Sequence, residues 1–157
     1  MKNSSLLIIA YLLISTSLNA KPLELRPLLK DRFEQNCAIR QEYDFHDENT
    51  DLVEPLSSYI VDSKYTEEQV YDLTSYQLKN TFYAGIPITQ FEIGFGRPAQ
   101  QYNEYLYFNL ATTFAKKAFN TLNFNSKVNG NVSVEYKGKI AQVHCYWLND
   151  DKDEPKK

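Results

Sequence analysis

A covalent link between the two ends of a chain limits its possible folds more than any local pattern does. This sequence offers one such link, because its two cysteines, Cys37 and Cys145, stand near opposite ends of the 157 residues. Disulfides persist in exported proteins, and closing a loop of this length removes about 4–5 kcal/mol of unfolded-chain entropy. The alternative is a catalytic thiol assisted by His144, but neighbouring residues of a strand point to opposite faces. We therefore expect a disulfide between Cys37 and Cys145.

The first 20 residues have the three parts of a secretory signal peptide. Lys2 gives a basic start, the apolar run Leu6–Ile14 follows, and small residues lead to Ala20. A transmembrane anchor is the alternative, but this run is well short of the ~20 apolar residues that cross a bilayer. We expect cleavage after Ala20 and a periplasmic or secreted protein without membrane insertion. Residues 149–157 have no apolar side chain to bury, so a single domain of residues 21–148 should precede a disordered tail.

The charge balance excludes one class of partner. Seventeen Lys and Arg residues oppose 20 Asp and Glu residues, which gives a net charge of −3, and no basic run is present. Nucleic-acid binders need a concentrated basic surface, so we expect no nucleic-acid partner. Aromatic residues make up 14% of the chain and include 12 tyrosines. Tyrosine covers the wet rim of small cores and is also enriched at protein interfaces, so both roles stay open.

Two segments in the first half have helical spacing. Residues 27–43 carry Leu29, Phe33 and Cys37 four positions apart, after a proline that suits a first helical turn. We expect a helix there with Cys37 facing inward. Residues 66–69 have a capping-box pattern, and apolar residues then recur on one side of a helix that should end near Gly85.

Residues 86–95 fit two structures. Phe91, Ile93 and Phe95 alternate with polar residues and glycine, as in a strand. Ile88, Phe91 and Phe95 also suit one face of a helix. The local pattern does not decide between the two.

Strand patterns dominate the last third of the chain. Residues 104–110 alternate as in a half-buried strand, residues 112–124 suit a short amphipathic helix, and residues 132–136 and 140–148 flank a turn as in a hairpin. A two-residue loop of Lys137 and Gly138 would place Val134 opposite Ala141. This register gathers an apolar set on one face, namely Val132, Val134, Ala141, Val143, Cys145 and Trp147. The opposite face collects Ser133, Glu135, Gln142, His144 and Tyr146.

The segment from Gly85 to Pro98, with the aromatic strand at 105–108 and the hairpin, resembles the BamE/SmpA/OmlA lipoproteins and the related β-lactamase-inhibitor-protein fold. In that superfamily a glycine opens a short second helix and a Gly-x-Pro closes it. The resemblance covers about residues 66–148 and implies a helix at 86–95. The implied fold class is α+β: two helices packed on one face of a three-stranded antiparallel sheet. An N-terminal helical extension and a helical insertion at 111–131, between the first two strands, would complete it.

Two motifs come close to ligand-binding patterns and fail. Asp47, Asn49 and Asp51 match the first ligands of a calcium loop, but Leu52 replaces the required glycine and Ser58 the closing glutamate. A solvated acidic loop is the better interpretation, and we expect no metal. Residues 94–99 satisfy a loosened dinucleotide pattern, but Pro98 obstructs the helix that should follow. We expect no cofactor.

The sequence favours a non-enzymatic protein-protein interaction module, because no complete catalytic constellation is visible. A sheet covered by helices on one side leaves its other face open, and open aromatic faces usually bind a partner. The expected binding residues on that face are Tyr105, Tyr107, Glu135, Gln142, His144 and Tyr146. The partner would be another protein of the cell envelope or a secreted enzyme, and the chain an assembly accessory or an inhibitor. The alternative is a small secreted hydrolase that uses His46 or His144 with neighbouring acids.

Overall fold

Most of the ordered secondary structure is β-strand. The computed structural model describes residues 21–35, 37, 53–99, 101–124 and 131–148. In these residues the elements, in chain order, are β1 (Leu23–Glu24), α1 (Arg26–Phe33), α2 (Val53–Leu56), the 3₁₀ helix η1 (Ser57–Tyr59), β2 (Ile60–Glu67), β3 (Tyr71–Tyr83), β4 (Ile86–Gly96), β5 (Gln101–Phe108), α3 (Thr112–Phe119), β6 (Val132–Lys137) and β7 (Ile140–Leu148).

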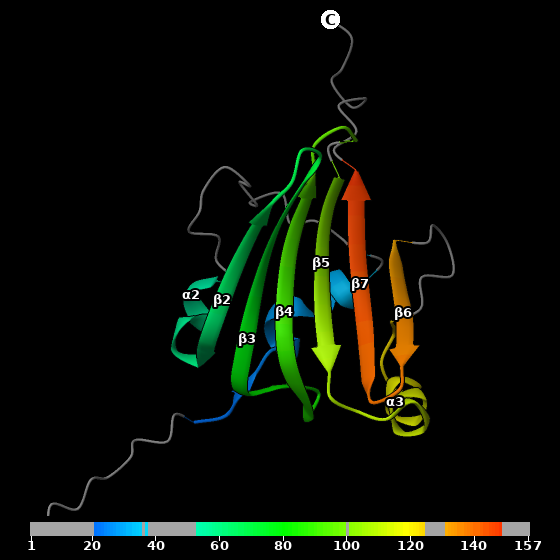
Figure 1. Cartoon of the computed structure of the whole chain (residues 1–157). Coiled ribbons are helices and arrows are strands. Elements are labelled where there is room, and N and C mark those ends of the chain that lie inside the picture. The colour runs from blue at the N-terminus through cyan, green and yellow to red at the C-terminus, as the bar shows by residue number, and fades with distance from the viewer. Residues whose placement is uncertain (1–20, 36, 38–52, 100, 125–130, 149–157) are drawn as a thin grey trace, which may run out of the picture.

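One mixed sheet contains every described strand. Its long strands are ordered β2-β3-β4-β5-β7-β6, and each of these neighbours is antiparallel. The short β1 runs parallel to the end of β3, on the same edge as β2. The chain leaves β5 through α3, forms the edge strand β6, and returns as β7 between β5 and β6 (Figure 1). The only parallel pairing among these strands is therefore the two-residue contact of β1.

The core lies between α1 and one face of this sheet. Leu29 and Phe33 of α1 are buried, and they join a cluster that includes Phe91, Leu106 and Val143 from three adjacent strands. In Figure 1, α1 lies behind the sheet and the strands lie in front of it. The predicted inward-facing side of the first helix is confirmed, although α1 ends at Phe33 and residues 38–43 lie outside the described part of the chain.

The predicted disulfide is confirmed. Cys37 follows α1, Cys145 lies in β7, and their Cα atoms are 5.4 Å apart. Beside it, Arg32 of α1 forms an ion pair with Glu104 of β5, and both side chains are buried. Glu104 is the register partner of Cys145, so the two attachments are adjacent on the sheet. Together they fasten the end of α1 to the adjacent strands β5 and β7.

The predicted fold class is wrong. Instead of two helices on a three-stranded sheet, the described residues form a seven-stranded sheet with three short helices. Residues 71–83, expected to be helical, form β3, and residues 86–95, expected to be helical from the family resemblance, lie in β4. We take nothing further from that resemblance, because the fold it implied is not the one observed.

Register shifts interrupt both β3 and β4, and the β-bulge in β4 explains why that strand looked helical. The register of β3 against β4 shifts between Gln77 and Thr81, where Asn80 has a φ of 53°. The register of β4 against β5 shifts between Ile88 and Gln90. A bulge adds one residue to a strand, so the core-facing residues on its two sides are no longer an even number apart. Ile88 and Phe91 both face the core three positions apart, which imitates a helical spacing.

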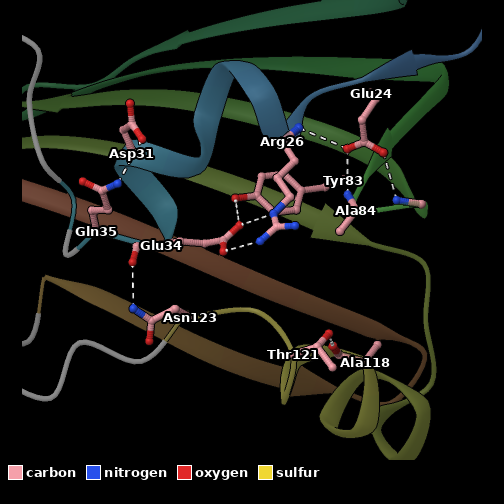
Figure 2. A network of polar contacts seen from close by, with 11 residues as sticks. Glu24, Arg26, Asp31, Glu34, Gln35, Tyr83, Ala84, Ala118, Thr121 and Asn123 are labelled. Carbon is pink, nitrogen blue, oxygen red and sulfur yellow. Dashed lines mark hydrogen bonds and ion pairs between the residues drawn. The ribbon is translucent and has the colours of Figure 1, made fainter.

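A tight turn joins β3 to β4. Ala84 and Gly85 have φ values of 51° and 74°, which suit the two-residue turns that match strand twist. The Glu24 carboxylate accepts hydrogen bonds from both turn amides, at 2.7 and 2.9 Å. Figure 2 shows this carboxylate beside the turn. β1 and the turn therefore stabilise each other.

A second polar network holds the start of α1 against β3. Arg26 donates to both oxygens of Glu34, at 2.7 and 2.9 Å, and the Tyr83 hydroxyl donates to the same carboxylate at 2.8 Å (Figure 2). Asn123 donates its side-chain amide to the Glu34 carbonyl oxygen at 2.9 Å. The hydrogen bond from Arg26 lowers the pKa of Glu34, and burial opposes this shift.

The last third of the chain matches the sequence predictions. The strand expected at 104–110 is β5, and the helix expected within 112–124 is α3. The hairpin is present, but its loop is Gly138 and Lys139, so Val134 pairs with Val143 and not with Ala141. A register shift of two residues leaves each side chain on its original face. The predicted division of the hairpin into two faces is therefore correct for residues 132–135 and 141–146.

Candidate binding face

We call the sheet face opposite α1 the open face, because no described helix lies over it (Figure 1). Three cross-strand rows make up its centre on β3, β4, β5 and β7. In this strand order the rows are Leu73-Gly94-Asn103-Tyr146, Ser75-Glu92-Tyr105-His144 and Gln77-Gln90-Tyr107-Gln142. The last two rows continue onto β6 at Ser133 and Glu135. Side chains on alternate residues of each strand share one face, so each row presents its side chains on the same side.

The six residues proposed from the sequence do come together here. Tyr105 and Tyr107 lie on β5, Gln142, His144 and Tyr146 lie on β7, and all five side chains are half-buried. The sixth, Glu135, lies on the edge strand β6 and is exposed, with its carboxylate 2.8 Å from Lys137.

A carboxylate occupies the middle of the open face. Glu92 is 8% exposed and accepts hydrogen bonds from Ser75 and Gln90, each at 2.6 Å, and from the Tyr107 hydroxyl. Gln77 donates to Gln90 at 2.7 Å, which fixes the orientation of that amide. Burial and the hydrogen bond to Glu92 raise the pKa of Tyr107, so its hydroxyl stays protonated as a donor at neutral pH. The carboxylate is thus held by neutral groups alone among the described residues.

A stack of rings lies beside this carboxylate. The rings of Tyr105 and His144 are parallel to within 9°, with centroids 4.3 Å apart. His144 Nε2 is 2.9 Å from Asn103 Oδ1, and Gln101 donates to the same oxygen at 2.8 Å. Burial lowers the pKa of His144, and the neighbouring Glu135 opposes the shift. The imidazole is therefore neutral at pH 7, and the stack carries no charge.

A glycine makes room for one more tyrosine. The Tyr71 ring lies over Gly94, where an added Cβ would be 2.8 Å from Tyr71 Cζ. The Tyr105 hydroxyl donates a hydrogen bond to Tyr71, which together with burial raises the pKa of Tyr105. Gly94 was considered above as part of a dinucleotide motif. It lies within a strand, and its role there is steric.

The charge of the open face is concentrated at one residue. The three rows listed above contain one carboxylate, that of Glu92, and no lysine or arginine on β3, β4, β5 or β7. Charged residues near the margin include Asp62 and Lys64 on β2, the exposed Lys79 two positions after Gln77 on β3, and the paired Glu135 and Lys137 on β6. A cationic group that reached the centre would meet an anion that has no counter-ion among the described residues.

Sequence reasoning missed every residue that β3 and β4 contribute to this face, among them Tyr71 and Glu92, and it also missed Asn103 of β5. The alternation of Phe91, Ile93 and Phe95 would have placed Glu92 opposite the core, had residues 86–95 been taken as a strand. Asn103 precedes the segment assigned to a strand, although its spacing from Tyr105 puts both on one face.

The alternatives from the sequence are not supported further. His46 and the acidic loop at 44–51 lie outside the described residues. His144 bonds to Asn103, and within the described part of the chain no carboxylate forms a hydrogen bond with its ring. The described residues contain no group of three or more His, Cys, Asp and Glu side chains placed to hold a metal ion. They also contain no helix with the length and apolar character needed to cross a membrane.

Comparisons of the chain with protein-family models, with curated proteins and with solved structures gave no match.

Proposed function

We propose that this chain is an exported, non-enzymatic binding protein whose open face receives another protein of the cell envelope or a secreted enzyme. The observation that carries the proposal is the recessed Glu92 carboxylate, surrounded by tyrosines on a face without lysine or arginine at its centre. Buried carboxylates and aromatic faces both attract cations. The partner is therefore a folded protein that presents an arginine or lysine side chain to this centre.

The rigidity of the open face supports a binding role. Tyr107 is fixed by Glu92, and Tyr105 is fixed by Tyr71 and by the stack with His144. Side chains that are ordered before binding lose little conformational entropy when a partner docks. Tyrosines also give large contact areas with few rotatable bonds, which suits interface anchors.

Tyr146 is the most suitable anchor to test. Its ring lies next to His144, with centroids 5.7 Å apart, and it is half-buried at one end of the stack. Tyr107, in contrast, also satisfies Glu92, so its removal would change stability and binding together. The sequence alone offers no reason to prefer Tyr146 to Tyr107 among the expected binding residues.

The test is capture and titration of one partner. The parent chain is used to capture a stoichiometric partner from envelope extract, and the purified partner is then titrated calorimetrically with variants. Tyr146→Ala should weaken binding by about 30-fold, as for a central aromatic anchor. Glu92→Gln keeps the shape of the side chain and removes its charge, and we expect at least tenfold weaker binding.

A matched control lies away from the open face. Lys117→Ala changes an exposed residue of α3 and should leave affinity unchanged. A partner that binds Tyr146→Ala and Glu92→Gln as tightly as the parent would place its site elsewhere and contradict the proposal. Loss of binding in Lys117→Ala would contradict it equally.

A further inference from the structure

The strand β2 forms one edge of the sheet and is unusually exposed. Among the described strands it pairs with β3 alone, so the backbone groups along its other side have no strand partner there. Two of its large side chains are mostly in solvent, Val61 at 57% and Tyr65 at 60% exposure. An edge of this kind is a template for pairing with another strand, and proteins normally block it.

Two of the three charged residues of β2 are placed for self-recognition, whereas the third, Glu67, forms an ion pair with Arg97 at 3.0 Å. Asp62 and Lys64 lie two residues apart on one face, both are exposed, and no ion pair joins either to a described residue. The opposite edge strand differs, because Glu135 and Lys137 of β6 are paired with each other at 2.8 Å. Asp62 and Lys64 are therefore available to a partner strand.

We propose that two copies of this chain associate by pairing β2 with β2, antiparallel, about a twofold axis at Ser63. In this register Asp62 of each copy lies opposite Lys64 of the partner subunit. Opposite charges directly across an antiparallel pair of strands are favourable. Twofold symmetry repeats each pair, so every favourable contact occurs twice.

The neighbouring registers are excluded by charge. A twofold axis perpendicular to the sheet keeps each side chain on its own face, so a residue must lie opposite its own copy at the axis. The nearest alternative registers therefore have Asp62 or Lys64 at the axis instead of Ser63. Centring the axis on Asp62 places two aspartates opposite each other, and centring it on Lys64 places two lysines opposite each other. Like charges directly opposite are destabilising. Of these three registers, the one centred on Ser63 alone has opposite charges facing.

This association would leave the open face free. β2 lies at the edge of the sheet, two strands away from the centre of the open face on β4 and β5 (Figure 1). The two sheets would join into one, with both open faces on the same side. The inference is therefore independent of the function proposed above.

Charge exchange tests the register directly. The purified chain is followed by sedimentation velocity over a range of concentrations, with the parent and with Asp62→Lys, Lys64→Asp and the double exchange. Each single variant puts like charges in both pairs, so its dimer dissociation constant should rise by about tenfold or more. The double exchange restores opposite charges and should return to within about threefold of the parent.

Mixing the two single variants provides the sharpest result. Asp62→Lys has lysine at both positions 62 and 64, and Lys64→Asp has aspartate at both. A mixture of the two variants should therefore form a heterodimer that is tighter than the parent dimer. The control Lys117→Asp changes the net charge as Lys64→Asp does, but on α3, and should dimerise as the parent does. A parent that stays monomeric throughout, or single variants that dimerise as well as the parent, would overturn the proposal.

Discussion

The ring of Tyr71 on β3 covers Gly94 on the adjacent strand β4, and leaves no space for a side chain there. A Cβ at Gly94 would be 2.8 Å from Tyr71 Cζ, closer than carbon atoms approach without a shift of the structure. Alanine normally suits a strand better than glycine does. Here we expect Gly94→Ala to lower the free energy of unfolding by about 1–3 kcal/mol, as overpacking does. Urea denaturation measures this loss of unfolding free energy.

The same strand supplies the control. A Cβ at Gly96 would be 3.6 Å from the Gln101 Cβ, which is an ordinary contact, so Gly96→Ala should change stability little. In a Tyr71→Ala background the ring is absent, and adding Gly94→Ala should then cost almost nothing. An equal cost of Gly94→Ala in both backgrounds would show that the ring is not the cause.

The disulfide should contribute much of the stability of this protein. Cys37 and Cys145 are separated by 108 positions, and cross-linking a loop of that length constrains the unfolded chain by about 4–5 kcal/mol. We expect the Cys37→Ser/Cys145→Ser variant to lose an amount of this order in urea denaturation. Reduction of the parent should have the same effect, and should not change the variant. Equal stability of parent and variant would contradict the prediction.

The buried ion pair beneath α1 gives a different prediction. Arg32 and Glu104 are 6% and 0% exposed, so removing one of the two charges leaves the other buried without the opposite charge of its ion pair. We expect Arg32→Met to lower the free energy of unfolding by about 3–5 kcal/mol. The double variant Arg32→Met/Glu104→Leu removes both charges and should recover most of that loss. A double variant that is no more stable than Arg32→Met would show that the unpaired buried charge is not the cause of the loss.

What the sequence could predict depended on how regular each strand is. β5, β6 and β7 keep an uninterrupted alternation against one another, and they were predicted with their faces correct. β3 and β4 each contain a register shift, which breaks the period of two, and in β4 the shift imitates helical spacing. A bulge depends on pairing with a distant segment, so local spacing does not report it. The long-range pairing of β3 with β4 decided the structure, and the family resemblance reinforced the wrong choice.

The residues of the open face divide in the same way, between regular strands that were predicted and interrupted strands that were not. Tyr105, Tyr107, Gln142, His144 and Tyr146 were placed on one open face because β5 and β7 are regular. Glu92, which carries the charge of that face, was missed because β4 was taken as a helix. Its hydrogen bonds with Ser75 and Tyr107 join residues 17 and 15 positions away, and such contacts follow only from the fold.

The pH dependence of stability should report the environment of His144. Burial keeps the pKa of His144 in the folded protein below its ordinary value, so the unfolded chain binds this proton at a higher pH than the folded chain does. Its contribution to stability is fully present above the unfolded pKa, about 6.5, and is lost as the pH falls from there through the folded pKa. We expect the free energy of unfolding of the parent to fall between about pH 7 and pH 5, relative to that of His144→Gln.

The difference between parent and variant isolates this one group. His46 and the carboxylates are present in both proteins, and the lowered pKa of Glu34 acts at more acidic pH, so their contributions cancel in the difference. Protonation of His144 would also place a positive charge on the open face, and binding of a basic partner should weaken over the same range of pH. If the parent and His144→Gln show parallel stability profiles from pH 7 to pH 5, then burial does not lower the pKa of His144. In that case the imidazole would be charged near pH 6, and its position at the centre of the open face would oppose a cationic partner.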